Sequence, residues 1–179
     1  MPDLTTASQA KFVDMALLYR PTNSESPELI ALENLLRSLP SATASLNQSD
    51  YGILRRFPAP VSIETKIPGG DVEEAKVQLG VWTAAWYKRM RDLCPNRKQR
   101  LFNVPLFLVE GDRWSLYVAC EKESAIYIYG PEDLGSTNSI AGLYRLVAIL
   151  KAIGKWVTIY FWPWFSKTIC SAVPAGDFK

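Results

Sequence analysis

The chain has 179 residues, of which 48% are hydrophobic and 21% charged, and its formal net charge is +2. This length and balance suit one globular domain with a real core, and the small net charge gives no overall bias towards nucleic acid or membranes. The chain contains no histidine, which excludes histidine general bases, histidine triads and histidine metal sites. Its three widely spaced cysteines are typical of free thiols in a reducing compartment: Cys94, Cys120 and Cys170.

The first ten residues are polar and lack the apolar core of a signal peptide. They predict a loose leader, followed by a single domain over residues 11–179. No uncharged apolar run reaches the roughly 18 residues that a membrane span requires. We therefore expect an intracellular protein of the cytoplasm or nucleus that has no membrane partner.

The first predicted strand covers residues 11–19, KFVDMALLY, which are apolar almost throughout and so favour a central place in a sheet. Asp14 interrupts this run. A carboxylate there must be paired, bound to a metal ion or placed at the edge of a cleft. A helix is expected from Pro27 to Leu39, with Ser26 as its cap and Pro40 after its end. The connection at residues 41–59 contains Asp50, the alternative to Asp14 as an upstream acid.

A second predicted strand begins at Val61 and carries Glu64 and Lys66 on one face, because side chains alternate along a strand. The Pro-Gly-Gly of residues 68–70 ends it. Asp71 then provides a good N-cap for a helix that packs back on the sheet. The buried face of that helix is predicted from three- and four-residue spacing: Val72, Ala75, Leu79, Trp82, Trp86 and Met90.

Glu64 and Lys66 form a Glu-x-Lys triplet, which suits metal-dependent cleavage of phosphodiesters. The carboxylate can hold a divalent cation, since such cations prefer oxygen ligands. The lysine can orient or deprotonate the attacking water, or neutralise phosphate charge. The same triplet is ordinary on a solvated strand face, so the hypothesis depends on the rest of the chain. We expect Glu64 to be an exposed carboxylate that contributes little to folding.

A basic cluster follows the helix between residues 88 and 100. It is interpreted either as cations at a helix C-terminus with a solvated loop, or as a patch for a phosphate backbone. The candidate substrate-binding residues, should the substrate be nucleic acid, are Lys88, Arg89 and Arg91, together with Trp82.

The second half predicts a meander of three strands over residues 101–110, 113–120 and 125–129, then a loop over 130–135. A last helix is expected to begin at Ser136 or Thr137. Its apolar stripe is wide, which predicts burial on more than one side. The tail, IYFWPWF, is expected to serve core or interface packing. The predicted seam residues of the last helix are Ile140, Leu143, Val147, Leu150, Gly154, Val157 and Phe161.

The ordered series of Asp14, then Glu64-Thr65-Lys66, then Gln78 four residues before Trp82 resembles the PD-(D/E)XK nuclease superfamily. Three longer segments look most like fungal PD-(D/E)XK nuclease-like proteins, several of which lie in secondary-metabolite loci. The resemblance covers roughly residues 11–166 and implies an α/β fold, a restriction-endonuclease-like mixed β-sheet flanked by helices. The three segments are residues 62–82, 135–147 and 160–165.

The resemblance also implies a site in which Asp14 and Glu64 hold Mg2+, Lys66 lies beside the water and Gln78 braces the arrangement. This chain departs from the family in two ways. Only ten polar residues precede the first predicted strand, where the family has a helix and a further strand. Val13 stands where the family has proline before the acid. These departures leave three options: a shortened fold, completion by a partner chain, or reuse of the scaffold.

The leading hypothesis is therefore a Mg2+-dependent nuclease acting on nucleic acid, with Asp14, Glu64, Lys66 and Gln78 as catalytic residues. One alternative is a small-molecule enzyme of fungal secondary metabolism, a cyclase or isomerase that uses Glu64 and Lys66 without metal. The other is a non-catalytic, dimeric binding protein. In each case we expect a homodimer formed through the last helix and its aromatic tail.

Overall fold

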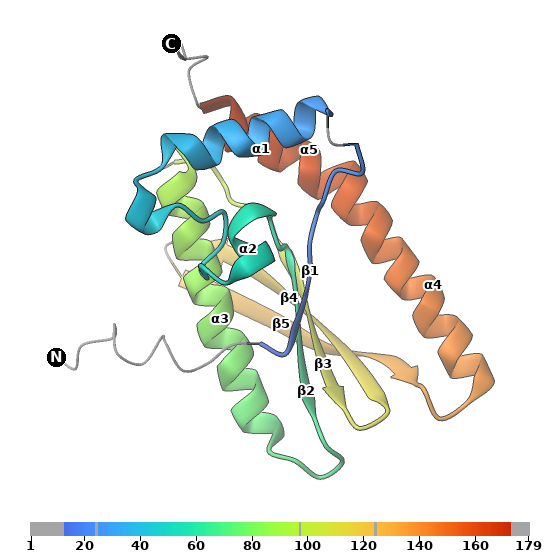
Figure 1. Ribbon diagram of the computed structural model, residues 1–179. Helices are drawn as coiled ribbons and strands as arrows, with labels where there is room; N and C mark the ends of the chain where they lie inside the picture. The colour runs from blue at the N-terminus through green and yellow to red at the C-terminus, as the bar shows by residue number, and fades with distance from the viewer. Residues whose placement is uncertain (1–12, 24, 97, 124, 173–179) are drawn as a thin grey trace, which may run out of the picture.

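The computed structural model describes residues 13–23, 25–96, 98–123 and 125–172, and the proposed leader, Lys11, Phe12 and Arg97 lie outside these ranges. A five-stranded sheet in the order β1-β2-β3-β4-β5 forms the middle of the molecule. Helix α3 lies along one side of it and α4 along the other, while α1 and α5 lie together at one end (Figure 1). The strands are β1 Met15–Leu17, β2 Val61–Lys66, β3 Val104–Glu110, β4 Arg113–Lys122 and β5 Ala125–Ser136. The helices are α1 Pro27–Ser38, α2 Gly52–Arg56, α3 Val72–Leu93, α4 Ile140–Trp156 and α5 Trp162–Thr168, and a π-helical turn, Val157–Phe161, joins the last two.

The sheet is mixed. Strand β1 pairs with β2 in antiparallel register, β2 pairs with β3 in parallel, and β3, β4 and β5 form an antiparallel meander. The parallel pair is joined by α3, because parallel neighbours need a crossover connection. A mixed sheet flanked by helices confirms the predicted α/β, restriction-endonuclease-like fold class.

Strand β1 differs from its prediction. It is only three residues long and lies at the edge of the sheet, whereas a long central strand was expected. Met15 is 48% exposed. The apolar residues that follow do not continue the ladder but pack on helices: Tyr19 stacks on Trp162 of α5, with ring centroids 4.4 Å apart. A run buried against helices has the same composition as a central strand, so hydropathy alone could not separate the two.

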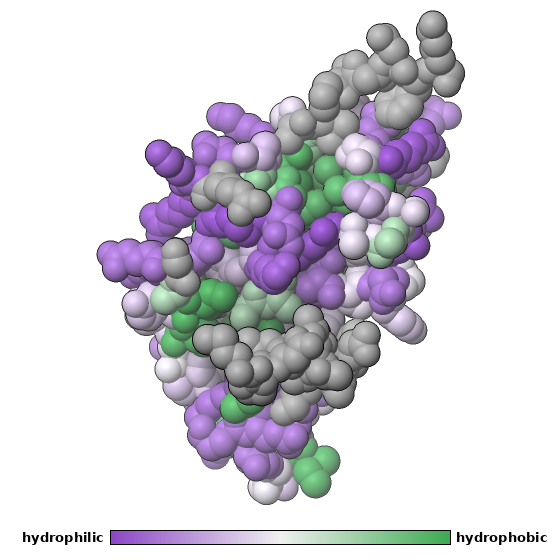
Figure 2. Space-filling model, turned by 90° about the vertical axis from the view of Figure 1, so that its left-hand side faces the viewer, coloured by the Kyte–Doolittle hydropathy of each residue, from purple (hydrophilic) through white to green (hydrophobic). Residues whose placement is uncertain are grey.

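Helix α3 agrees with its prediction. The Asp71 side chain caps it by accepting a hydrogen bond of 2.8 Å from the backbone N–H of Glu74. The opposite, outward side of the helix is exposed, and Figure 2 shows many hydrophilic residues on this side of the molecule, with apolar patches among them. The buried face contains Ala75, Leu79, Trp82, Thr83, Trp86, Tyr87, Met90 and Leu93.

The C-terminal half departs from its prediction at two elements. Strand β5 continues to Ser136 through the expected loop, with irregular pairing to β4. Helix α4 begins after Ser139, whose hydroxyl caps it. The helix is buried on one side only: Leu146 faces the core, whereas Ile140 is 78% exposed. No helix of the described ranges is long and apolar enough to cross a membrane.

Candidate active site

Glu64 lies in the interior of the sheet, on the face that α3 covers. Its strand, β2, is flanked by β1 and β3, and the Glu64 side chain is 3% exposed. This corrects the expectation of an exposed carboxylate. One carboxylate oxygen, Oε1, lies 3.3 Å from the Lys66 ammonium. The other, Oε2, is buried and has no hydrogen-bond partner among the described residues.

Lys66 brings the strand and the helix together. Its ammonium nitrogen lies 2.9 Å from Oε1 of Gln78, and this oxygen accepts the hydrogen bond. It also lies 3.6 Å from a carboxylate oxygen of Glu74. Residues four apart on a helix share a face, so Glu74 and Gln78 approach Lys66 from one side of α3. The tight turn at residues 67–70 permits this, because it returns the chain over the strand that it has just left.

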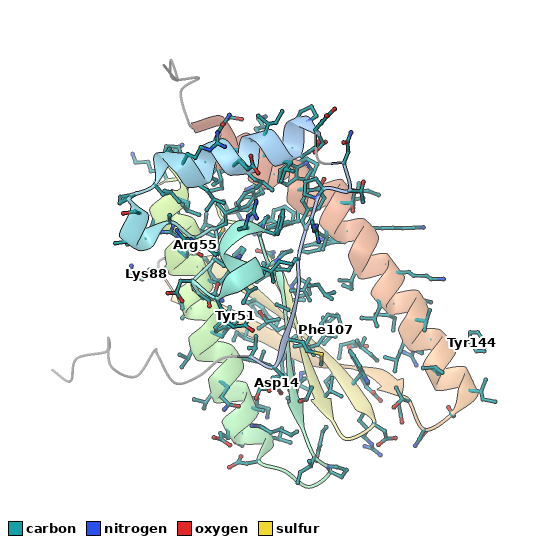
Figure 3. All side chains as sticks on the ribbon, viewed as in Figure 1. Asp14, Tyr51, Arg55, Lys88, Phe107 and Tyr144 are labelled. Atoms are coloured by element: carbon teal, nitrogen blue, oxygen red, sulfur yellow. The ribbon has the colours of Figure 1, made fainter. Side chains whose placement is uncertain are left out.

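Asp14 lies next to Glu64 across the β1–β2 pair. Met15 is paired with Ile63, so the residue before Met15 falls opposite Glu64. The Oδ2 atom of Asp14 accepts hydrogen bonds from the backbone N–H of Thr65 at 2.8 Å and from its hydroxyl at 2.5 Å. Both of these hydrogen bonds end on Oδ2, which leaves Oδ1 outside this contact with Thr65. Asp14 is exposed and lies just before β1 (Figure 3).

Glu64 and Lys66, the two charged groups on β2, differ in what shifts their pKa values. Burial, together with the nearby charge of Asp14, raises the pKa of Glu64 above its ordinary value of 4.5, although Lys66 and a hydrogen bond from the backbone N–H of Asp14 oppose the shift. Burial alone would lower the pKa of Lys66, but its hydrogen bond with Glu64 and the charges of Glu64, Glu74 and Asp14 together raise it. Lys66 is therefore an ammonium ion at neutral pH. It can neutralise or orient a reacting group, whereas it is a poor general base.

A family model described as the PD-(D/E)XK nuclease superfamily matches residues 1–162, which is most of the chain. The chain belongs to the PD-(D/E)XK nuclease superfamily. No curated protein and no solved structure matches it significantly.

PD-(D/E)XK nucleases usually use a divalent metal ion, so the fit of these residues to one matters. Within the described ranges, no group of three or more Cys, Asp or Glu side chains could hold a metal ion. Glu64 and Asp14 nevertheless offer one free oxygen each, Oε2 and Oδ1. Mg2+ commonly takes one or two protein carboxylates and completes its shell with water and substrate phosphate. The pair therefore fits a Mg2+ site of this open kind, and it does not form an all-protein cage.

The remaining predicted site residues lie elsewhere. Trp82 is buried in the core face of α3. Lys88 pairs with Asp92 at 2.9 Å, well away from Asp14 (Figure 3). Arg89 donates hydrogen bonds to backbone carbonyls of residues 43 and 45, and Arg91 donates to the carbonyl of residue 99 and pairs with a carboxylate on β4. These contacts favour the interpretation of the basic cluster as structural.

Two residues of the site were missed from the sequence, Thr65 and Glu74. Thr65 is the middle residue of the Glu-x-Lys triplet, and its contact with Asp14 depends on a strand register that the sequence does not reveal. Glu74 was detectable, because it precedes Gln78 by four residues on a predicted helix. Asp50, the alternative upstream acid, is exposed just before α2.

Proposed function

We propose that this protein hydrolyses phosphodiester bonds of nucleic acid, with Mg2+ held by Asp14 and Glu64. The observation that carries the proposal is the buried Oε2 of Glu64, which has no partner among the described residues and lies on the same face of β2 as the Lys66 ammonium. A buried, unpaired carboxylate oxygen costs free energy. Such atoms in folded proteins call for an explanation such as an absent ion. Membership of a nuclease superfamily supports the same reaction class.

Each side chain then has a role. Mg2+, when bound, supplies charge neutralisation at the phosphate and lowers the pKa of a water molecule. Glu64 and Asp14 position the ion, and Thr65 orients Asp14 through its two hydrogen bonds. Lys66 attracts the phosphate and orients the water. Gln78 keeps the Lys66 ammonium at the mouth of the site.

The test is cleavage of fluorescent single- and double-stranded oligonucleotides with and without Mg2+. We expect Mg2+-dependent cleavage that falls at least about 100-fold in Lys66→Met and Glu64→Gln, because each removes a group that contacts the reacting phosphate or its ion. Lys88→Gln, which removes an exposed cation outside the site, serves as the control and should stay near wild type. Equal cleavage by wild type and Lys66→Met would contradict the proposal.

A metal-free, small-molecule reaction is the second candidate. It is favoured by the raised pKa of Glu64, by its hydrogen bond to Lys66, and by the lack of a group of three or more metal-ligating side chains among the described residues. A carboxyl group whose pKa is raised and that lies beside an ammonium can exchange protons with a substrate without an ion. Resemblance to fungal nuclease-like proteins of secondary-metabolite loci motivates a cyclase or isomerase. Activity that persists in excess EDTA would favour this candidate over the nuclease.

We further propose a homodimer in the cytoplasm or nucleus, formed through the exposed side of α4. Leu143 and Tyr144 are 50% and 73% exposed there, and Tyr144 points away from the rest of the molecule (Figure 3). All charged residues of α4 are basic, whereas Glu132 and Asp133 are exposed on β5. A two-fold contact can therefore place the basic helix of one copy against the acidic strand of the other. Within the aromatic tail, Phe161, Trp162 and Phe165 are buried in their own chain, so its share of this surface is limited to Ile159 and Tyr160, which are 57% and 61% exposed.

A further inference from the structure

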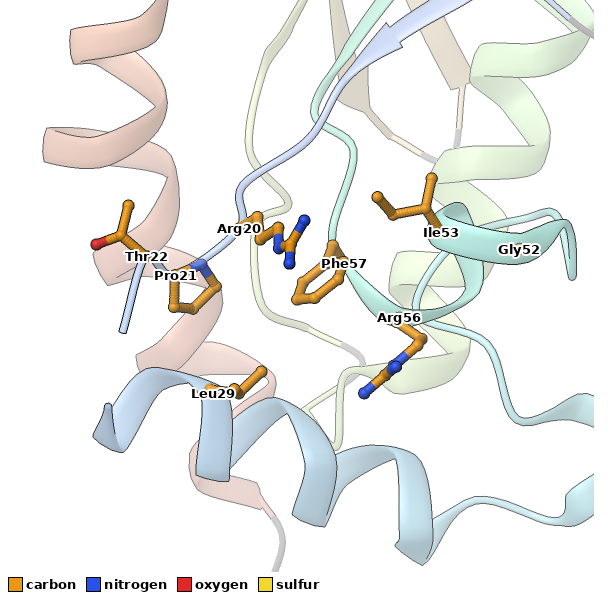
Figure 4. Close-up of a pocket in the computed structure, with 8 residues that line it drawn as sticks. All are labelled: Arg20, Pro21, Thr22, Leu29, Gly52, Ile53, Arg56 and Phe57. Carbon is orange, nitrogen blue, oxygen red and sulfur yellow. The ribbon is translucent and has the colours of Figure 1, made fainter. Parts of the chain in front are cut away.

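Apart from the candidate active site, the molecule has a pocket at the end where α1 and α2 meet the loop after β1. Its volume is about 460 Å3, within the range of small-molecule sites. Figure 4 shows that its lining side chains come from the loop after β1, from α1, and from α2 with the residue that follows it. The lining combines apolar side chains with two arginines: Arg20, Pro21, Thr22, Leu29, Gly52, Ile53, Arg56 and Phe57.

The two arginines converge on one aromatic ring. The guanidinium carbons of Arg20 and Arg56 lie 5.7 Å and 6.0 Å from the ring centroid of Phe57, within range of a cation–π contact. Phe57 is itself 7% exposed and so forms a fixed floor. In the view of Figure 4 the ring lies between the two side chains. Packing against the ring restrains both guanidinium groups before any ligand arrives.

The positive charge in this pocket is incompletely neutralised. Arg56 has a single, long contact with the Glu33 carboxylate, at 3.5 Å, and both partners are partly exposed. For Arg20, no described carboxylate lies within salt-bridge distance. A pocket wall that carries two incompletely neutralised cations favours an anion as its ligand.

From these contacts we infer that the pocket binds an organic oxyanion, a phosphate or carboxylate group attached to an apolar body. The guanidinium fork matches the geometry of both oxyanions, and Arg is the residue best suited to bind them. The apolar body lies against Leu29, Ile53 and Phe57. The pocket shares no residue with the candidate active site, so this site is independent of the proposed nuclease reaction.

The test is calorimetric titration of the full chain with four small probes: phenyl phosphate, benzoate, inorganic phosphate and benzyl alcohol. Phenyl phosphate or benzoate should bind at least about tenfold more tightly than inorganic phosphate, which lacks the apolar body, and than benzyl alcohol, which lacks the charge. The preference between phenyl phosphate and benzoate identifies the physiological ligand as a phosphate or a carboxylate.

Substitutions in and outside the pocket test whether the probe binds there. Arg20→Gln should weaken the preferred probe at least about tenfold, since it removes a charged hydrogen bond. Glu33→Gln should leave the affinity for this probe unchanged or increase it, because it removes the carboxylate that contacts Arg56. The matched control is Arg145→Gln, an exposed arginine of α4. Binding that is equal in Arg20→Gln and Arg145→Gln would overturn the inference, as would the absence of saturable binding at millimolar concentration or equal affinity for benzyl alcohol.

Discussion

Glu64 places a carboxylate where an unpaired charge is costly. One of its oxygens is paired with Lys66, and the other is buried without a partner among the described residues. Such a group is relieved either by a proton or by a cation. The raised pKa of Glu64 corresponds to relief by a proton, and the proposed Mg2+ site corresponds to relief by a cation. Stability and function therefore compete at this residue.

Glu64→Gln should raise the free energy of unfolding by about 1 kcal/mol at pH 7.5, because it removes a buried charge while keeping an acceptor for Lys66. The pKa of Glu64 is raised in the folded state above 4.5. The wild type therefore loses stability as the pH rises through that raised pKa, and the glutamine variant does not. Urea unfolding at pH 4 and pH 7.5 measures both effects.

The difference between the two proteins should shrink towards zero at pH 4, where Glu64 is protonated in both folded and unfolded states. Glu74→Gln, at a side chain that is 49% exposed, is the control and should change stability little. A Glu64→Gln protein that is less stable than wild type at pH 7.5 would show that the buried oxygen is satisfied.

Gln78→Met should lower kcat of the proposed hydrolysis about 10–100-fold with little change in KM, because supporting hydrogen bonds to site residues are typically worth this much. The substitution removes the 2.9 Å acceptor of Lys66 and keeps the side-chain length. Steady-state kinetics with one oligonucleotide measures the changes in kcat and in KM separately. Val77→Met, on the neighbouring exposed position, is the control; an equal loss in both variants would mean that Gln78 has no positioning role.

Parts of this site were predictable at the level of single residues. The family resemblance placed Gln78 beside the site, and Gln78 accepts a hydrogen bond from Lys66. The burial of Glu64 was not predictable, since it results from β1 and β3 pairing on both sides of β2. The roles of Arg89 and Arg91 were also hidden, because their partners lie far along the chain.

At the scale of elements, α3 links the fold to the site. Its buried face holds the core, while Glu74 and Gln78 reach the site from its first two turns. The position of these turns depends on the Asp71 cap. A shift in the start of the helix therefore moves Glu74 and Gln78 relative to the Lys66 ammonium.

Asp71→Ala should lower the free energy of unfolding by about 1 kcal/mol, since it removes an N-cap hydrogen bond. Chemical denaturation measures the loss. Asp92→Ala, near the other end of the same helix, is the matched control. It breaks only an exposed pair with Lys88, and it should cost no more than about 0.5 kcal/mol. Equal losses would show that the cap is not important for α3.

Elements with strong local signals were predicted well, and those set by tertiary contacts were not. Ser26 and Asp71 mark the starts of α1 and α3 as expected. Strand β5 is longer than predicted, because its pairing with β4 continues beyond a Gly-Pro pair whose local sequence is typical of a loop. Helix α2 was missed, since five residues are too few for a periodic pattern.

At the scale of the whole molecule, α4 leaves one long side uncovered. Its inner side packs through Leu146, with Ile149, Ile153 and Trp156 partly buried. Its outer side exposes apolar residues in its first half and lysines in its second. Exposed apolar surface of this kind commonly marks an interaction site, and a second copy is the occupant that the adjacent acidic strand favours.

Leu143→Lys should therefore convert the proposed dimer to a monomer of 20.1 kDa. Light scattering at micromolar concentration measures the mass. The control is Val77→Lys, which charges a comparably exposed apolar position on α3 and should leave the dimer intact. A wild-type protein that already has the monomer mass would remove the dimer from the account.

We propose that Asp14 and Glu64 together bind a divalent ion beside Lys66. The most direct measurement is the anomalous scattering of a crystal soaked in Mn2+, compared between wild type and Glu64→Gln. We predict one strong peak in the wild type between Oδ1 of Asp14 and Oε2 of Glu64, and none there in the variant. A wild-type crystal without a peak at these two oxygens, or with the same peak in both proteins, would contradict the account.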